Sequence, residues 1–292
     1  MESNPDRQSL AAALRDLRAR AGLSTYELAE RLGWSQSKAS KMERGQTAAD
    51  PGDVAAWARA TGADADTAAG LVTLAEAASN QMRSWQAVHG QGLASRQREI
   101  AEINTAMTRH REFAPDVVPG LLQTPPYAIR VLELADVSGR GGVPEAVAER
   151  MNRQAILYDP ARSFEFVLTE GALRYRAGPR EVMHGQAEKI ISVMPLPNVT
   201  VSVIPFTATP SALFVSGFVI YDIPDNPVVL VEILSRELQL RTAWDLRLYE
   251  ETFARLRDSA VTGPAAEDLI RDAMLSHSES SPVDLADLCD LS

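Results

Sequence analysis

The sequence predicts a multidomain chain, in which an all-α amino-terminal domain is followed by an α+β domain. Two observations predict this division. Residues 8–79 show only helical spacings of apolar residues, broken by glycines, without strand-like alternation. Beyond Phe113, short apolar runs rich in β-branched residues alternate with helical patterns. The chain of 292 residues is long enough for about two domains of ordinary size.

Composition places the chain among soluble globular proteins, because 45% of its residues are hydrophobic and 23% are charged. A single cysteine, Cys289, excludes an internal disulfide framework and a cysteine-rich zinc site. Residues 1–10 are polar and acidic, and no stretch of about 18 apolar residues is free of charge. We therefore expect a cytoplasmic protein that does not enter a membrane.

The first two helices are defined by their apolar spacing and by the signals at their ends. The first helix carries apolar residues at the i, i+3, i+4 and i+7 positions of one buried face, namely Leu10, Ala13, Leu14 and Leu17. Gly22 follows this run and predicts its end. In the second helix, Ser24 and Glu27 form a capping box at the start, and Gly33 marks the end.

Three more helices follow in the same region. Ser35 caps the third helix, in which Ala39 and Met42 face inward. The fourth helix begins at Asp50-Pro51, because proline is favoured at the first helical position. A fifth, alanine-rich helix is predicted over residues 65–79.

The formal charge of −10 is unevenly distributed along the chain. Between Arg7 and Arg59, nine basic residues stand against six acidic ones, whereas residues 250–292 carry three basic and ten acidic residues. An evenly spread acidic charge would argue against nucleic-acid binding, so the basic window is informative. The acidic segment 250–292 is predicted to lie away from any nucleic acid, and the alternative is that a basic surface holds it in the DNA-free protein. Its last part, residues 277–292, is predicted to be mobile.

The second and third helices match the helix-turn-helix motif, in which a turn containing glycine joins two short helices and the second helix enters the major groove of DNA. On the third helix, Ser37, Lys41 and Arg44 share one face, because they are spaced i, i+4 and i+7. Such a face offers hydrogen bonds to base edges and phosphates. The alternative is an ordinary solvated helix face.

The motif resembles the Cro and lambda-repressor-like (XRE-type) regulators over residues 8–61. The resemblance is carried by Leu14–Arg18, Gly22–Ser24, Glu27–Gly33, Ser35, Ser40, Glu43 and Gly45. It implies double-stranded DNA as a partner. Thr25 stands where many relatives have a glutamine that holds the DNA backbone, so a weaker hydroxyl contact is expected there. The predicted DNA-binding residues are Thr25, Ser35, Gln36, Ser37, Lys38, Ser40, Lys41 and Arg44.

The sequence predicts four segments: a DNA-binding domain at 1–80, a helical connector at 81–112, an α+β domain at 113–276 and the acidic tail at 277–292. Four apolar runs have the composition of strands, at Phe164–Leu168, Val199–Ile204, Phe214–Tyr221 and Val228–Ile233. Helical patterns flank them at Tyr127–Ala135, Pro144–Tyr158, Arg180–Met194 and Trp244–Asp258.

The larger domain also resembles a group of actinobacterial regulators that carry this helix-turn-helix at the front. Its matching segments are Phe113–Thr124, Tyr127-Ala128, Phe166–Leu173, Leu196–Val201, Ile204–Phe206 and Val229–Glu232. The resemblance implies a one-component regulator whose second domain senses a small-molecule effector or binds a small partner protein. Some members of the group are described as antitoxin-like.

An enzymatic function is not expected, because the sequence lacks a reactive constellation. Its four histidines are scattered without metal-ligand spacing, and it contains neither a nucleophile elbow nor a phosphate-binding loop. We therefore expect no metal and no cofactor.

Six residues are candidates for contact with a ligand or partner, namely Gln123, Tyr127, Glu170, Arg174, Glu232 and Arg236. The two glutamates could form a carboxylate pair beside the arginines. The alternative is structural, since such groups commonly form salt bridges or caps, and Gln123 and Tyr127 stand near a predicted helix start.

The leading hypothesis is a sequence-specific DNA-binding transcriptional regulator that acts as a homodimer. Dimerisation is expected because one short helix reads only a few base pairs. The runner-up is an antitoxin-like module that neutralises a small partner protein and binds DNA for autoregulation. An enzyme carried on a DNA-targeting domain ranks third.

Overall fold

The structure, a computed structural model, describes residues 5–47, 49–79, 81–84, 92–136, 139, 141–209, 211–233 and 236–275. Contacts divide the chain into two units. The first unit consists of Met1–Gly90, Ala106–His110 and Phe218–Thr252. The second unit consists of Gln91–Thr105, Arg111–Gly217 and Phe253–Ser292.

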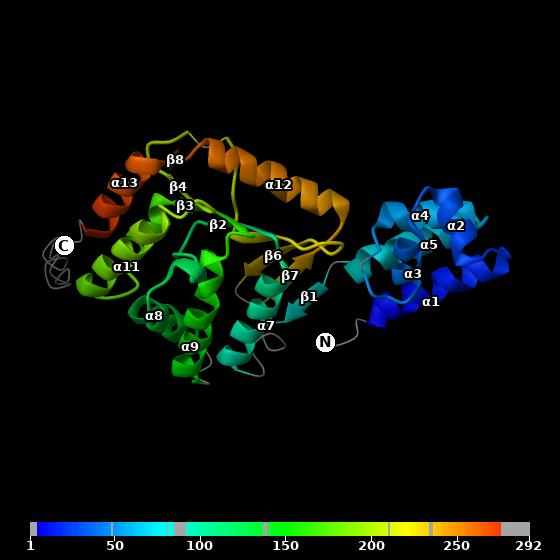
Figure 1. Ribbon diagram of the computed structural model, residues 1–292, viewed down its shortest axis with the longest axis horizontal. Coiled ribbons are helices and arrows are strands. Elements are labelled where there is room, and N and C mark those ends of the chain that lie inside the picture. The colour runs from blue at the N-terminus through cyan, green and yellow to red at the C-terminus, as the bar shows by residue number, and fades with distance from the viewer. Residues whose placement is uncertain are drawn as a thin grey trace, which may run out of the picture. The chain divides into compact units, whose positions relative to one another are not determined.

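The first unit begins with the five predicted helices, which Figure 1 shows in blue and cyan. Their bounds are α1 (Pro5–Arg20), α2 (Thr25–Leu32), α3 (Gln36–Glu43), α4 (Pro51–Ala60) and α5 (Ala65–Ser79). The all-helical domain is therefore confirmed, and α5 has the predicted bounds.

The predicted signals at the helix ends are also confirmed. Ser24 and Glu27 form both hydrogen bonds of a capping box at the start of α2, and the bond from the Ser24 backbone lowers the pKa of Glu27. Gly33 ends α2 in the left-handed conformation, with φ of 67°. Ser35 caps α3 by accepting a hydrogen bond from the Lys38 backbone, and Asp50 caps α4 through the Gly52 backbone.

One apolar core holds these helices together. It contains buried side chains from all five helices, including Leu10, Leu14, Leu28, Ala39, Met42, Val54, Trp57 and Leu71. Trp57 is completely buried, packs against the tilted ring of Trp34, and donates its indole hydrogen to the Leu14 carbonyl at 3.1 Å. The hydrogen bond that this buried indole donates offsets the cost of burying its polar N–H group.

The first unit also contains an antiparallel group of strands in the order β1-β7-β6-β5. Their bounds are β1 (Gln81–Ser84), β5 (Phe218–Asp222), β6 (Val228–Ile233) and β7 (Arg236–Leu240). The turn between β5 and β6 places Asp225 in the left-handed conformation, with φ of 60°. Aspartate tolerates this conformation better than most residues do.

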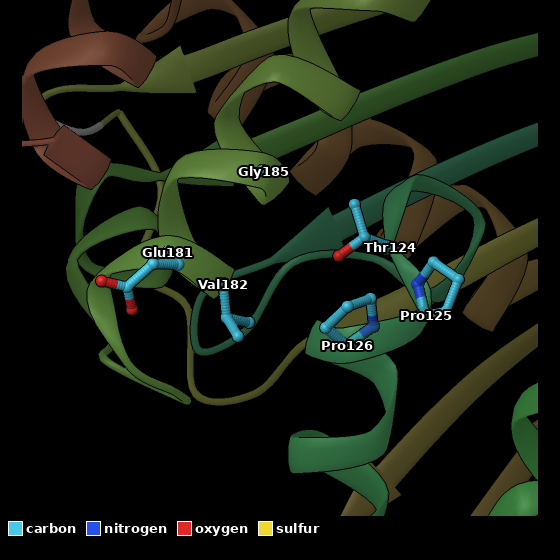
Figure 2. A pocket seen from close by; sticks show the side chains of 6 residues that line it. All are labelled: Thr124, Pro125, Pro126, Glu181, Val182 and Gly185. Carbon is cyan, nitrogen blue, oxygen red and sulfur yellow. The ribbon is translucent and has the colours of Figure 1, made fainter.

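The second unit combines helices with strands β3 (Ser163–Thr169), β4 (Val199–Ile204) and β8 (Val261–Thr262). β3 and β4 are parallel with Phe164 opposite Val199, and β8 pairs antiparallel with β4. The helices are α7 (Leu93–Ala106), η1 (Gly120–Leu122), α8 (Pro125–Ala135), α9 (Val143–Arg153), η2 (Gln154–Tyr158), α10 (Glu170–Arg174), α11 (Arg180–Val193) and α13 (Gly263–Leu275). The first turns of α8 and α11 face each other (Figure 2).

The remaining elements run through both units. They are β2 (Arg109–Ala114) and α12 (Ala243–Asp258). The predicted fold class, a helix-turn-helix domain followed by a mixed α and β region, is thus confirmed. The segment predicted as a helical connector contains α7, but it also contains β1 and the first residues of β2.

The strand predictions are correct at three of four runs, and the fourth begins too early. β4 and β6 have the predicted bounds, and β3 extends the predicted run by one residue at each end. Residues 214–217 lie outside β5. The ring of Phe214 packs edge-on against Phe113, and a Cβ at Gly217 would lie 3.1 Å from the Phe113 carbonyl oxygen. This stretch is therefore shaped by close packing and not by strand pairing.

Two further predictions concern the acidic tail and the membrane. The acidic tail at 277–292, including Cys289, lies outside the described residues. In the described ranges, none of the helices has the length and apolar content needed to cross a bilayer.

Replacing Trp57 with Phe is expected to lower the free energy of unfolding by about 1–2 kcal/mol, because the buried Leu14 carbonyl loses the indole donor. Denaturant unfolding followed by circular dichroism measures this change. The matched control is Trp244→Phe, since the Trp244 side chain is 64% exposed and its replacement is expected to matter by less than about 0.5 kcal/mol. Equal stability of the two variants would contradict the role given to Trp57.

Candidate nucleic-acid interface

The helix-turn-helix motif consists of α2, the turn at residues 33–35 and α3. The turn is closed by a hydrogen bond from the Trp34 backbone to the Ala29 carbonyl, 2.8 Å long. Ser35 then starts α3 in extended conformation. A short, hydrogen-bonded turn thus joins the two helices, and it fixes the direction of α3 relative to α2.

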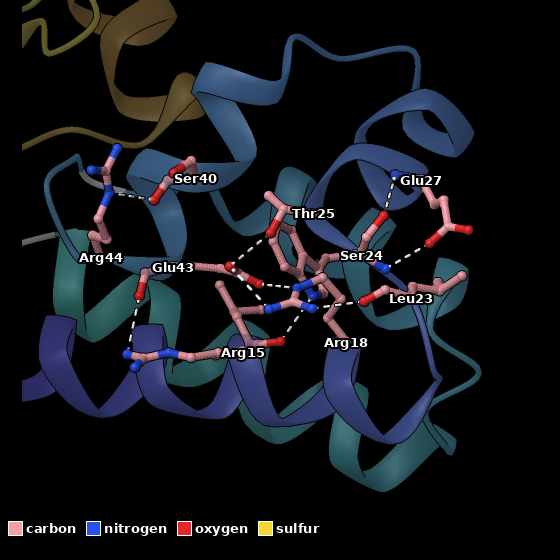
Figure 3. A network of polar contacts seen from close by, with 11 residues as sticks. Arg15, Arg18, Leu23, Ser24, Thr25, Glu27, Ser40, Glu43 and Arg44 are labelled. Carbon is pink, nitrogen blue, oxygen red and sulfur yellow. Dashed lines mark hydrogen bonds and ion pairs between the residues drawn. The ribbon is translucent and has the colours of Figure 1, made fainter.

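A buried carboxylate fixes α3 against the other helices. Glu43, the last residue of α3, is 8% exposed and forms an ion pair with the Arg18 guanidinium of α1 (Figure 3). Its other oxygen accepts a hydrogen bond from the Thr25 hydroxyl of α2 at 3.3 Å. Arg18 also donates to the Leu23 carbonyl at 2.6 Å, and Arg15 donates to the Glu43 carbonyl at 3.2 Å. One carboxylate therefore links three helices.

This network bears on the predicted phosphate contact of Thr25. A hydroxyl has one proton to donate, and a phosphate oxygen is an acceptor. In this structure the Thr25 proton is directed to Glu43, so the hydroxyl is engaged inside the domain. No spacing in the sequence indicated that Thr25 takes part in this network.

The outer face of α3 carries the other predicted DNA-binding residues. Gln36, Ser37 and Arg44 are exposed, whereas Ala39 and Met42 are buried beneath them. Arg44 follows α3 and donates from its Nε to the Ser40 carbonyl at 3.2 Å. The structure therefore presents a polar, basic surface on α3, on the side opposite the core.

Lys38 is held by two partners that the sequence analysis did not identify. Its ammonium lies 4.1 Å from the centre of the Trp34 ring and 2.8 Å from the Asp53 carboxylate at the start of α4. A cation over an aromatic face and beside a carboxylate is attracted by both. Lys38 is consequently positioned by its own domain, with its charge balanced by Asp53.

Lys41 has a partner far away in the sequence. Its Nζ lies 2.8 Å from the carboxylate of Asp225, in the turn between β5 and β6 of the same unit. The hydrogen bond from Lys41 lowers the pKa of Asp225, which is therefore ionised at neutral pH. No local sequence signal could have indicated this pair, because 184 residues separate its members.

In the second unit, the predicted ligand residues Gln123 and Tyr127 are buried. Gln123 donates to the Val118 carbonyl at 2.8 Å and accepts from the Arg150 guanidinium at 2.6 Å. The Tyr127 hydroxyl accepts a hydrogen bond from the Val118 backbone, and burial raises the pKa of Tyr127 to about 12. Both side chains are therefore buried groups that stabilise the segment before α8 by hydrogen bonds to the Val118 backbone.

The predicted charged residues lie in different units. In the second unit, Glu170 accepts hydrogen bonds from Arg174 at 2.7 Å and from the Phe206 backbone at 2.8 Å. Arg174 also pairs with Asp272 of α13, and these carboxylates raise its pKa. In the first unit, Glu232 is exposed near the end of β6, and Arg236 begins β7. The structure does not describe the side chain of Arg236.

A pocket of about 390 Å³ lies where α8 and α11 begin (Figure 2). It is lined by Thr124, Pro125, Pro126, Glu181, Val182 and Gly185. Figure 2 shows the carboxylate of Glu181 pointing away from the two prolines, so the lining is largely apolar. The size lies within the usual range of small-molecule pockets. Gln123 and Tyr127 are neighbours of this pocket in sequence, but they do not line it.

The structure thus defines a protein of the helix-turn-helix class, with a DNA-binding domain at the amino-terminal end. Residues 9–71 match a helix-turn-helix domain family. Residues 97–272, more than half of the chain, match the domain of unknown function DUF5753, and the chain belongs to this family. No curated protein and no solved structure matches the chain.

Replacing Glu43 with Gln is expected to destabilise the helical domain by about 2–3 kcal/mol, because the largely buried Arg18 guanidinium loses its counter-charge. Thermal unfolding measures the loss. Glu30→Gln removes the same charge from an exposed site on α2 and serves as control. If the two variants have the same unfolding temperature, the buried ion pair does not hold α3 in place.

Proposed function

We propose that the chain is a sequence-specific transcriptional regulator of the Cro and lambda-repressor (XRE) type, which binds double-stranded DNA through α3. The observation that carries this proposal is the outer face of α3. Exposed Gln36, Ser37 and Arg44 stand over a buried side of the helix. Amide, hydroxyl and guanidinium groups are the donors and acceptors that read base edges and grip phosphates.

The regulator is proposed to bind as a two-fold dimer. α3 has eight residues, so one copy reaches only a short stretch of the major groove. Two copies related by a two-fold axis would contact half-sites about 10 base pairs apart, or a multiple of that spacing. Paired half-sites supply the discrimination that one helix lacks.

The second domain is proposed to sense a ligand or partner and to perform no catalysis. The apolar pocket between α8 and α11 supports a small-molecule effector, because it has the size and lining of a ligand site. Both oxygens of Glu170 accept internal hydrogen bonds, which favours a structural role for this carboxylate. The resemblance of Phe166–Leu173 and Val229–Glu232 to actinobacterial regulators supports membership of that group.

An antitoxin-like, protein-binding function is the second candidate, and one observation favours it. In the loop after β4, Leu213 is 90% exposed and Val215 is 97% exposed. The loop is anchored before Leu213 and between the two exposed residues. The Ser211 hydroxyl donates to the Arg255 carbonyl at 2.7 Å, and the Phe214 ring packs against Phe113. Anchored apolar side chains that face solvent are typical of protein-binding surfaces.

The DNA-binding proposal is tested by selecting DNA fragments on the full chain and titrating the enriched site. Lys41→Ala is expected to weaken binding about tenfold, the scale of one lost contact to a base or phosphate, while the free energy of unfolding stays within about 0.5 kcal/mol. Lys189→Ala, on α11, is the matched control. Failure to enrich any site, or equal affinity of the two variants, would count against the proposal.

The second candidate is tested by replacing Leu213 and Val215 with Asp in the full chain. If a small partner protein docks on the loop, the double variant no longer retains that partner in a pull-down from the native cell extract, and it binds the selected DNA site as before. The loop has no such role if the variant and the original chain retain the same proteins.

A further inference from the structure

Helix α3, the proposed DNA-reading helix, is in contact with a carboxylate from outside the helical domain. Asp225 belongs to the turn between β5 and β6, and its carboxylate lies 2.8 Å from the Nζ of Lys41 on α3. The side chain of Lys41 is 36% exposed and that of Asp225 is 73% exposed. The pair is therefore at a surface, where other anions can reach the ammonium.

A second contact joins the same regions. Asp50 caps α4 with one carboxylate oxygen, and its other oxygen accepts a hydrogen bond from the backbone of Ala243 at 2.9 Å. Ala243 is the first residue of α12. Two carboxylates, one on each side, thus connect the helical domain to the β5–β6 turn and to the start of α12, all within the first unit.

We propose that the Asp225 carboxylate takes the place of a DNA anion on Lys41, so that this docked arrangement is an autoinhibited state of the regulator. The proposal rests on the proposed DNA-binding function of α3. DNA then competes with Asp225 for the same ammonium. A signal in the rest of the chain can change DNA affinity by moving the β5–β6 turn.

The chemistry of the two anions supports this competition. A carboxylate and a phosphate both accept short, charge-assisted hydrogen bonds from an ammonium. A phosphate that approaches Lys41 meets the like charge of Asp225 beside it, so the two anions repel each other. The turn also suits the task. Asp225 has a left-handed backbone and stands between Pro224 and Pro227, whose rings restrict the chain, so the carboxylate is presented by a preorganised loop.

Autoinhibition requires a docked state that can be reversed. Exposed ion pairs contribute little stability, so releasing Asp225 costs little. Arg241 directly follows β7, and burial together with the charge of Arg7 on α1 lowers its pKa to about 10. Like charges at this junction favour separation. Lys38 differs from Lys41, since its partner Asp53 lies on α4 and moves together with α3.

The test compares full-chain variants on the DNA site selected above. Asp225→Asn is expected to bind this site about threefold more tightly than the original chain, the scale of one exposed ion pair. Asp66→Asn on α5 is the matched control, because it removes the same charge from an exposed position of the helical domain. In a Lys41→Ala background, Asp225→Asn is expected to have no more effect than Asp66→Asn.

A second measurement detects the contact without DNA binding as the readout. In a Cys289→Ser chain, Lys41→Cys and Asp225→Cys are expected to be joined within one chain by a short bis-maleimide. Saturating the protein with the selected DNA should abolish this intramolecular cross-link, because the DNA covers residue 41 and displaces the turn that carries residue 225.

The outcomes separate this inference from the function on which it rests. If neither the original chain nor Asp225→Asn enriches any DNA site, the proposed function fails. If DNA binds but Asp225→Asn behaves like Asp66→Asn, or if DNA leaves cross-linking unchanged, the autoinhibition is refuted while the DNA-binding function stands.

Discussion

The geometry of the DNA-binding domain depends on the carboxylate of Glu43. A buried charge is tolerated only when it is paired and hydrogen-bonded. Glu43 meets this requirement with groups from two other helices, the guanidinium of Arg18 and the hydroxyl of Thr25. Without these partners, the Glu43 carboxylate would be an unpaired charge in a small apolar core. The outward direction of Gln36, Ser37 and Arg44 is a consequence of this pairing, since their positions follow from the helix that Glu43 terminates.

The parts of the fold that the sequence predicts well are those with local causes. The capping box of Ser24 and Glu27 and the left-handed Gly33 involve residues within one turn of each other, so their spacing is visible in the chain. The partners of Lys38 and Lys41 are different. Asp53 and Asp225 meet these lysines only after tertiary packing. The position of the candidate site on α3 could therefore be predicted from the sequence, but the carboxylates that pair with its two lysines could not.

Strands β2 and β7, which the sequence did not predict, also depend on tertiary contacts. β2 buries His110 and Arg111, and β7 buries Glu237 and Gln239. Alternation of apolar and polar residues predicts a strand only when the buried side is apolar. Where tertiary contacts stabilise buried polar groups, the strand no longer shows an alternation of apolar and polar residues. In the second unit, Gln186 likewise acts from inside, since it accepts from the Thr124 backbone and donates to the Leu122 carbonyl, which holds the start of α8 in place.

The pairing of Lys38 with Asp53 also affects how DNA affinity responds to ionic strength. Cations that neutralise phosphates release the small ions condensed on DNA, and this release makes affinity fall steeply as salt rises. An ammonium that already holds a carboxylate exchanges one fixed anion for another, and the freed carboxylate then attracts cations from solution. Fewer ions are released in total. For the proposed interface we therefore expect a slope of log affinity against log salt that is shallower than the number of basic residues on α1, α2 and α3 implies, with a larger share of the binding carried by hydrogen bonds to bases.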